Sequence, residues 1–243
     1  VLKLSSKLRN SFGYKSINKE DCFSSSRLEL LPGTEITDLI KSRVNNSAYV
    51  SYYNIGENSP RDRAMAMLIK TYIGQPYYME LRTNQQLGYI VAAGAYSRDN
   101  FSGMYCIVQS DSYTPEDVKK RSEEFLLGSI DGLNSLGKEQ FETFKSAVKE
   151  QINEKSTSIS KEADRRHAIA YEFENNYDRD TQTLKALNEI TIQDLKNTLS
   201  IALNEDTKRN VTILLYANGL DVPENIAPTF EDLDNWKQLQ LYK

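Results

Sequence analysis

The sequence predicts an α+β fold with two layers, in which helices pack on one face of a largely antiparallel sheet. Strand patterns gather in the first half of the chain, helical patterns fill most of the second half, and one strand pattern follows the helices. The sequence contains no fixed-period repeat and no low-complexity tract. Early strands followed by a block of helices are the order expected of this class.

Four segments carry a clear strand pattern. The run SAYVSYYNIG at 47–56 alternates two sets of side chains and is rich in tyrosine. YIVAAGAY at 89–96 and SGMYCIVQS at 102–110 are separated by a short polar turn, which predicts an antiparallel hairpin. The small residues of this hairpin indicate that a bulky element, such as a helix, lies close to it. NVTILLYA at 210–217 predicts the last strand, and Arg27–Leu31 is a weaker candidate.

Helix starts are marked by capping residues. Ser59 followed by Pro60 predicts a start, because serine caps the first free N–H groups and proline presets the first φ. Gly74 and Pro76 are expected to break this helix, and a second short helix is predicted over Tyr77–Gln86. Apolar stripes predict further helices over 114–137, 141–152, 159–170, 181–188 and 191–202.

Three regions are expected along the chain. Residues 1–26 are predicted to be the end of a preceding domain and a linker, because apolar residues recur every three to four positions before Gly13. This short helix could also lie on a membrane surface, although it lacks tryptophan and packing on a neighbouring domain is favoured. Residues 27–220 form the main domain, and 221–243 are expected to be a tail that wraps over its surface.

Composition limits the classes of partner. Acidic residues outnumber basic ones 34 to 30, so no excess of cations is present to bind nucleic acid. No apolar run approaches the roughly 20 residues that span a bilayer. We expect a soluble protein, cytoplasmic or periplasmic, without a targeting segment. Cys22 and Cys106 are expected to be reduced or packing residues, with one disulfide left open, and they do not decide the compartment.

The inventory of reactive side chains is small. The only histidine, His167, is expected to face the core or an interface, whereas zinc sites need three or four ligands. Serine or cysteine nucleophiles would lack a base, and no phosphate-binding glycine motif occurs. The sequence therefore predicts no metal and no cofactor site in this chain, and no self-sufficient hydrolase.

The candidate site is the stretch LRTNQQLGYIV, at Leu81–Val91. If a helix ends near Arg82 and a strand starts at Tyr89, both side chains can project from one end of the sheet. A guanidinium and a phenol could together bind a peptide carbonyl or a developing oxyanion. In the alternative, Arg82 pairs with Glu80 or a neighbouring helix and Tyr89 only packs.

These residues resemble a known family. PYYMELRTNQQLGYIV, together with IVQS, NYDRDT and VTILLYA, is similar to the C-terminal, fourth domain of the pitrilysin/insulysin family of inverzincin peptidases. The resemblance covers about residues 27–220, and its first block is the most specific part. It implies the fold of a mitochondrial-processing-peptidase-like metallohydrolase domain.

The resemblance also implies a function. In that family two halves close around a chamber, and the zinc motif H-x-x-E-H, absent here, belongs to the N-terminal half. Zn²⁺ is thus expected in that half, which would be the partner of this chain, with peptides as substrates. Arg82 would hold the substrate, Tyr89 would donate to the scissile carbonyl, and the isolated chain would be inactive.

Two alternatives stay open at this point. The chain could be a non-catalytic scaffold or peptide-binding module of the same fold, in which an exposed strand edge at Arg27–Leu31 or Ala48–Ile55 pairs with an extended peptide. It could also be an unrelated α+β domain. Peptide selectivity and oligomeric state are not predicted by the sequence.

Overall fold

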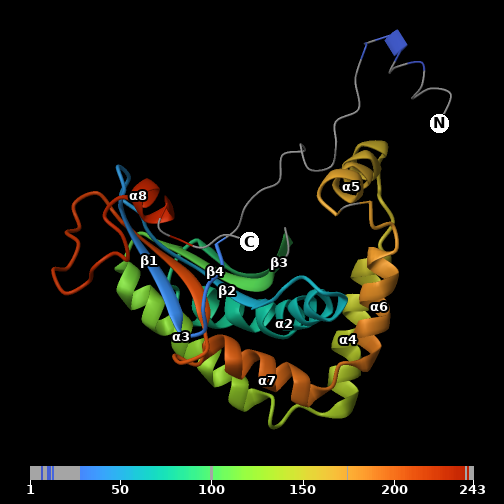
Figure 1. The fold of residues 1–243 in the computed structure, drawn as a ribbon. Coiled ribbons are helices and arrows are strands. Elements are labelled where there is room, and N and C mark those ends of the chain that lie inside the picture. The colour runs from blue at the N-terminus through green and yellow to red at the C-terminus, as the bar shows by residue number, and fades with distance from the viewer. Residues whose placement is uncertain are drawn as a thin grey trace. The chain divides into compact units, whose positions relative to one another are not determined.

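A five-stranded sheet with helices against one face organises the chain (Figure 1). The computed structural model describes residues 7, 10, 11, 13, 28–98, 101–173, 175–238 and 240. The chain divides into two units, one of residues 30–239 and the other of residues 1–29 with 240–243. Most of the helix predicted before Gly13 lies outside the described residues. All elements below belong to the first unit.

The sheet has the strand order β1-β5-β2-β4-β3. β1 and β5 are parallel, and the other three pairings are antiparallel, so the prediction of a largely antiparallel sheet is confirmed. The hairpin of β3 and β4 is also confirmed. The bounds of the strands are β1 Thr34–Lys41, β2 Ser47–Gly56, β3 Ile90–Arg98, β4 Phe101–Ser110 and β5 Arg209–Tyr216.

The prediction of a strand at Arg27–Leu31 was wrong. Within residues 28–31 only Leu28 forms an isolated bridge, and the first strand begins after Gly33. Gly33 has a φ of +76°, and its N–H donates to the carbonyl of Lys208 at 2.9 Å. The glycine turns the chain into β1 beside the start of β5. The strand edge that was expected at Ala48–Ile55 is also absent, because β2 lies between β5 and β4.

The first helix, α2 at Pro60–Tyr78, starts where the sequence predicts. The Ser59 hydroxyl accepts from the N–H of Asp62 at 3.1 Å, and the Asp62 carboxylate accepts from the N–H of Ser59 at 3.1 Å. Two N–H groups of the helix end are thereby satisfied. The predicted break was wrong, because α2 continues through Gly74 and Pro76 and passes into the π-helix η2, Met79–Asn84.

Burial explains why the helix continues. Ile73, Tyr77 and Leu81 are fully buried at intervals of four residues across the proline. Breaking the helix there would expose this apolar stripe, at roughly 1.5–3 kcal/mol for each large side chain. Gly74 faces the sheet, since a Cβ there would stand 3.4 Å from the carbonyl oxygen of Ala93. The glycine therefore allows α2 to pack closely on β3.

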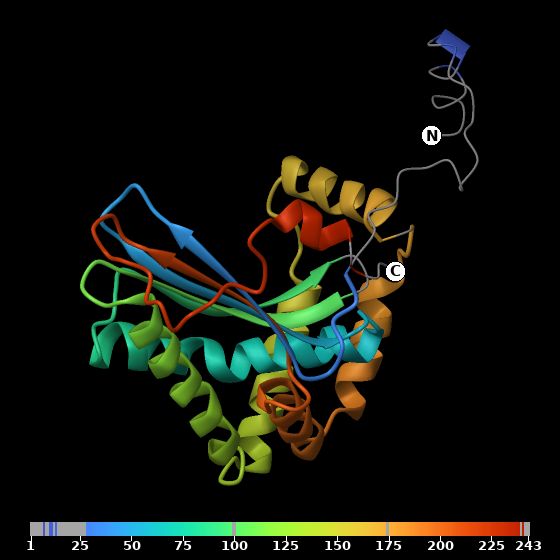
Figure 2. The ribbon, with the colours of Figure 1, turned by 60° about the vertical axis from the view of Figure 1, so that its left-hand side comes forward.

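The later helices pack beside α2. In two views α2, α3 and α7 lie on the same side of the sheet (Figure 1, Figure 2). Thr114 caps α3 and Thr191 caps α7, and these are the residues at which the predicted helical ranges begin. The bounds are α3 Pro115–Gly132, α4 Lys138–Asn153, α5 Ile159–Tyr171, α6 Arg179–Glu189, α7 Ile192–Leu203 and α8 Leu233–Gln238.

The core lies between the sheet and these helices. It contains buried tyrosines as well as aliphatic side chains, and their hydroxyls are paired. Tyr49 and Tyr53 share a hydrogen bond of 3.3 Å, and Tyr77 shares one of 2.7 Å with Ser122. Paired hydroxyls let large rings be buried without leaving polar groups unsatisfied.

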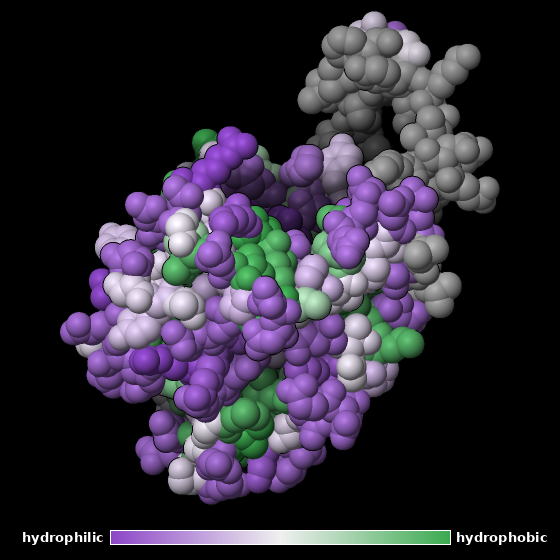
Figure 3. Space-filling model, turned by 90° about the vertical axis from the view of Figure 1, so that its left-hand side faces the viewer, coloured by the Kyte–Doolittle hydropathy of each residue, from purple (hydrophilic) through white to green (hydrophobic). Residues whose placement is uncertain are grey.

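The segment after β5 contacts the edge of the sheet. The N–H of Thr229 donates to the carbonyl of Thr37 at 2.8 Å, and the N–H of Thr37 donates to the Thr229 hydroxyl at 2.7 Å. The outer side of β1 is therefore covered at its middle. A space-filling view from the left of Figure 1 shows a mostly hydrophilic surface on which apolar groups gather in separate areas (Figure 3).

Candidate functional site

The candidate site is built on the π-helix η2 and the corner that follows it. Leu81 and Leu87 are both fully buried, and the N–H of Leu87 donates to the carbonyl of Leu81 at 2.9 Å. Arg82 follows the first of these anchors directly. A π-helical turn is uncommon and often marks a functional segment. Here it places a half-buried arginine on a backbone that is held at both ends.

Gly88 makes the corner possible. A Cβ at this position would lie 1.8 Å from the carbonyl oxygen of Gln109, which belongs to the main chain of β4. No other residue can pass so close to that strand without movement of the backbone. Tyr89 follows at the surface, with 83% of its side chain exposed, and β3 begins at the next residue.

The structure brings Arg82 and Tyr89 together. The guanidinium carbon of Arg82 lies 5.8 Å from the centre of the Tyr89 ring. Such a contact contributes about 0.5–1 kcal/mol at an exposed site. Within the described part of the chain, no ion pair or hydrogen bond engages the Arg82 guanidinium or the Tyr89 hydroxyl. Both polar ends are thus directed to a ligand or to solvent.

Glu80 is not the partner of Arg82. Its carboxylate accepts from the side-chain amides of Asn84 at 2.8 Å and Gln85 at 2.9 Å. Hydrogen bonds from Gln85 and then Asn84 lower the pKa of Glu80 below its usual value. The alternative in which Arg82 pairs with Glu80 is therefore not what the structure contains.

One residue that contacts the end of η2 was not predicted from the sequence. Arg121 on α3 donates to the side-chain oxygen of Gln85 at 3.4 Å, and its guanidinium lies 4.7 Å from the ring centre of Tyr113. This arginine links α3 to the end of η2. Glu80 and Asn84 are four residues apart, a spacing that brings two side chains together on a helix. Their hydrogen bond could therefore have been predicted from the sequence. No local signal indicated Arg121.

The sheet face opposite the helices carries a tyrosine cluster. Tyr52 on β2 lies 5.8 Å from the ring of Tyr96 and 6.2 Å from that of Tyr105. A Cβ at Gly94 would meet the Tyr105 ring at 2.4 Å, and one at Gly103 would meet the Tyr96 hydroxyl at 2.5 Å. The two strand glycines thus make room for rings on this face. The helix that was expected to lie close to the hairpin is α2, which packs against β3.

Comparisons with known proteins show what this chain is similar to. A family model described as "PQQ synthase PqqF-like, C-terminal lobe domain 4" matches residues 68–167. The chain is 26% identical over 196 residues to the insulin-degrading enzyme homolog of Dictyostelium discoideum, covering 77% of this chain and 20% of that protein. It is 25% identical over 179 residues to the insulin-degrading enzyme of Homo sapiens, covering 73% and 18%.

A solved peptidase structure has the same fold. A crystal structure of pitrilysin superposes on all of this chain and 26% of its own, with a TM-score of 0.81 and 18% identity. The chain is thus similar to the C-terminal domain of M16 peptidases, and for this similarity we call it the M16 domain. This M16 domain spans about a fifth of the length of the curated relatives it matches.

The M16 domain places its other reactive residues away from the corner. His167 on α5 is exposed, and its ring centre lies 4.5 Å from that of Tyr171. Of the two expected positions, the core is therefore wrong, and an interface stays a prediction. The reason is that no residue of α5 is buried. Cys106 is a buried free thiol, and burial raises its pKa to about 12. Cys22 lies outside the described residues.

Metal ligands do not gather in the part of the M16 domain that the structure describes. No group of three or more histidine, cysteine, aspartate or glutamate side chains there could hold a metal ion. The same residues include no helix with the length and apolar character needed to cross a membrane. The donor set of these described residues does not fit zinc.

Proposed function

We propose that this M16 domain is the zinc-free half of a peptidase active site, and that it encloses and positions peptide substrates for a zinc-bearing N-terminal half. The observation that carries the proposal is the pair of Arg82 and Tyr89, whose polar ends are free at one corner of the sheet. In the proposed enzyme these two groups face the substrate. The chain alone does not hydrolyse peptides, because it brings no metal ligands together in its described part.

The two side chains have different tasks. Arg82 stays charged at any working pH and can hold a carbonyl or carboxylate oxygen of the substrate with two parallel N–H groups. The Tyr89 hydroxyl donates to the carbonyl oxygen that gains negative charge as the peptide bond is attacked. Gly88 and the buried Leu81 and Leu87 fix the distance between the two groups. Preorganised donors of this kind contribute most when water is excluded.

The sheet face opposite α2, α3 and α7 supports peptide enclosure. Tyr52, Tyr96 and Tyr105 form a ring cluster on this face. Tyrosine offers a large apolar surface with a polar tip, which suits contacts with extended peptides of varied sequence. The corner with Arg82 lies at the start of β3, next to this face.

The roles of Arg82 and Tyr89 can be tested in the assembled enzyme. The chain is combined with the N-terminal half, and cleavage of a fluorogenic peptide is compared for Arg82→Ala and Tyr89→Phe. Loss of one oxyanion donor lowers rates by roughly 10²- to 10³-fold in other enzymes, and we expect a similar loss in kcat here. The matched controls are Arg43→Ala and Tyr171→Phe, which alter exposed residues elsewhere. Wild-type rates for both site variants would remove the proposed roles.

A second function is supported by the edge strand. The same domain could bind peptides without catalysis, as a scaffold subunit, because β3 ends the sheet and can pair with an extended chain. The parent reading frame separates the two functions. An upstream H-x-x-E-H motif favours the peptidase, and its absence favours the scaffold.

A further inference from the structure

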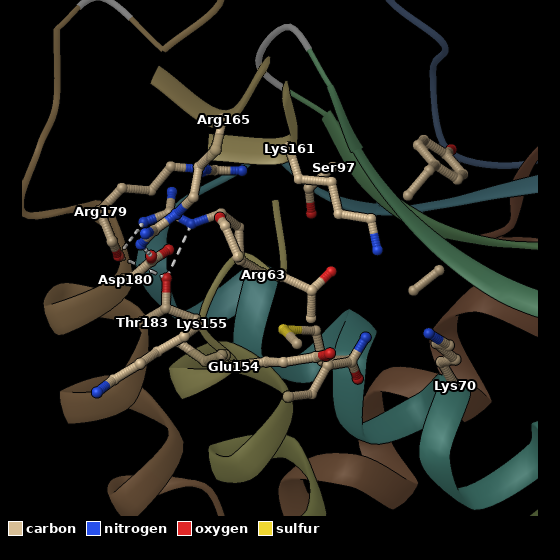
Figure 4. Close-up of a pocket in the computed structure, with 17 residues that line it drawn as sticks. Arg63, Lys70, Ser97, Glu154, Lys155, Lys161, Arg165, Arg179, Asp180 and Thr183 are labelled. Carbon is tan, nitrogen blue, oxygen red and sulfur yellow. Dashed lines mark hydrogen bonds and ion pairs between the residues drawn. The ribbon is translucent and has the colours of Figure 1, made fainter. Parts of the chain in front are cut away.

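A large cavity lies beside the end of β3, away from the corner with Arg82. Its volume is about 510 Å³, and one wall is made by residues 95–97 of β3. The other walls come from α2, the end of α4 with the segment that follows it, α5 and the start of α6 (Figure 4). The cavity is therefore closed on several sides by elements that are far apart in the sequence.

The cavity carries an excess of positive charge. Six cationic side chains and two carboxylates line it; they are Arg63, Lys70, Lys155, Lys161, Arg165, Arg179, Glu154 and Asp180. Asp180 pairs with Arg165 at 2.6 Å. Within the described residues no ion pair engages the other cations of the lining. An anionic ligand would meet a strong local field.

Two of the cations, Arg63 and Arg179, lack a direct ion pair within the described residues, although the charge of Asp180 acts on both. Arg63 is only 7% exposed and donates to the Thr183 hydroxyl at 3.0 Å and to the carbonyl oxygens of Asn58 at 2.5 Å and Arg179 at 3.5 Å. All three acceptors are uncharged. Burial and then the charge of Arg63 lower the pKa of Arg179 to about 10. Both guanidiniums stay charged at neutral pH, so a nearby anion would relieve their repulsion.

β3 offers main-chain groups along the same wall. It is an edge strand, and its outer side makes no main-chain hydrogen bond within the described residues. The strand IVAAGAYSR contains neither proline nor lysine, which are the residues that commonly block pairing at a sheet edge. An extended segment of another chain could add to β3 there.

We propose that an acidic peptide segment binds at this place, pairs as an extended strand with the outer edge of β3, and puts its carboxylates among the cations of the cavity. Figure 4 shows Arg63, Arg165 and Arg179 gathered with Asp180 at one end and Lys161 reaching inward from α5, whereas Lys155 points away. The segment would thus contact both the main chain and the charged end. The site gives the proposed peptidase a preference for acidic substrates. This substrate preference rests on the proposed function.

The lining favours a peptide over a compact polyphosphate. Met67, Ala95, Tyr96 and Ile152 contribute apolar surface, which a phosphate chain would leave unused. Glu154 and Asp180 would repel a ligand that carries several charges on few atoms. A peptide can space its carboxylates two residues apart, on one side of the strand, and avoid both acids.

Binding can be measured on the chain without the N-terminal half, so its failure is separate from failure of the proposed catalysis. The probe is a fluorescent peptide of alternating glutamate and threonine, followed by fluorescence anisotropy. We expect Lys70→Gln/Lys161→Gln to weaken binding about tenfold, which corresponds to about 1.4 kcal/mol. The control Lys149→Gln/Lys185→Gln removes the same charge outside the lining and should change binding less than about twofold.

Three further ligands test whether binding depends on the carboxylates, on strand pairing and on a peptide rather than a polyphosphate. A glutamine–threonine peptide should bind much more weakly, and so should the acidic peptide with alternate amides N-methylated, because methylation blocks strand pairing and keeps the charges. Undiminished binding of the methylated peptide would overturn the strand pairing. Tripolyphosphate that binds more tightly than the acidic peptide and displaces it would overturn the peptide assignment. Equal weakening of peptide binding by the cavity variant and the control variant would show that only net charge matters. That result would also overturn the assignment of the binding site to the cavity.

Discussion

Substitution of Gly88 by alanine tests whether the corner between η2 and β3 is as tight as the structure indicates. The new Cβ would lie 1.8 Å from the Gln109 carbonyl oxygen, whereas ordinary contacts begin at 3.4 Å. The corner or β4 therefore has to move by about 1.6 Å, which is more than side-chain adjustment can supply, because the contacted atom belongs to the main chain.

The cost can be bounded. Overpacking in well-packed regions costs about 1–3 kcal/mol, and the buried neighbours Leu81 and Leu87 leave little room here. With a urea m-value of about 3 kcal/mol per molar, the unfolding midpoint should fall by about 0.3–1 M. Urea unfolding of the chain, followed by circular dichroism, measures this shift.

The matched control is Gly128→Ala in α3, where a Cβ meets nothing within 4 Å. Alanine is favoured over glycine in a helix by about 0.8–1 kcal/mol, so the control should raise the midpoint. The two glycine variants are thus expected to move in opposite directions. A Gly88→Ala protein that unfolds at or above the wild-type urea concentration would refute the packing argument for the corner.

Two further predictions concern the core and the buried charges. Tyr77→Phe removes the hydrogen bond to Ser122 and should lower the free energy of unfolding by about 0.5–1.5 kcal/mol, measured in urea. Burial alone would raise the pKa of Glu35, but ion-paired hydrogen bonds from Lys119 and Lys208, each at 2.6 Å, lower it below 4.5. A lowered folded-state pKa stabilises the protein above the unfolded-state value, and this contribution is lost as the pH falls through the folded-state pKa. Glu35→Gln should therefore flatten the fall in stability below about pH 4.5, and an unchanged acid profile would contradict this.

Local signals predicted those parts of the fold that depend on neighbours in sequence. The cap at Ser59 and the β3–β4 hairpin were predicted because their partners lie within a few residues. β1 was not predicted, since its partner β5 is far along the chain and parallel pairing leaves no local pattern. Pro76 was taken as a break, but burial of the apolar stripe around it outweighs the lost hydrogen bond.

The same distinction applies to the two sites. Arg82 and Tyr89 are seven positions apart across one glycine corner, so their proximity could be predicted from the sequence, and the structure has it. The basic cavity could not be predicted, because its cations come from α2, the segment after α4, α5 and α6, and meet only when these elements pack around the end of β3. A corner depends on one short segment, whereas a cavity depends on the whole arrangement of elements.

The position of the two sites on β3 relates them physically. Arg82 and Tyr89 lie at the start of this strand, and the cavity lies at its end around Ala95–Ser97. A strand rises about 3.3 Å per residue, so roughly six residues of an extended peptide would separate a carbonyl held at the corner from a carboxylate held in the cavity. If both proposals hold, lengthening or shortening the spacing between the scissile bond and the acidic segment of a substrate should change KM with a single optimum. A KM that does not depend on this spacing would show that the two sites do not bind one peptide at the same time.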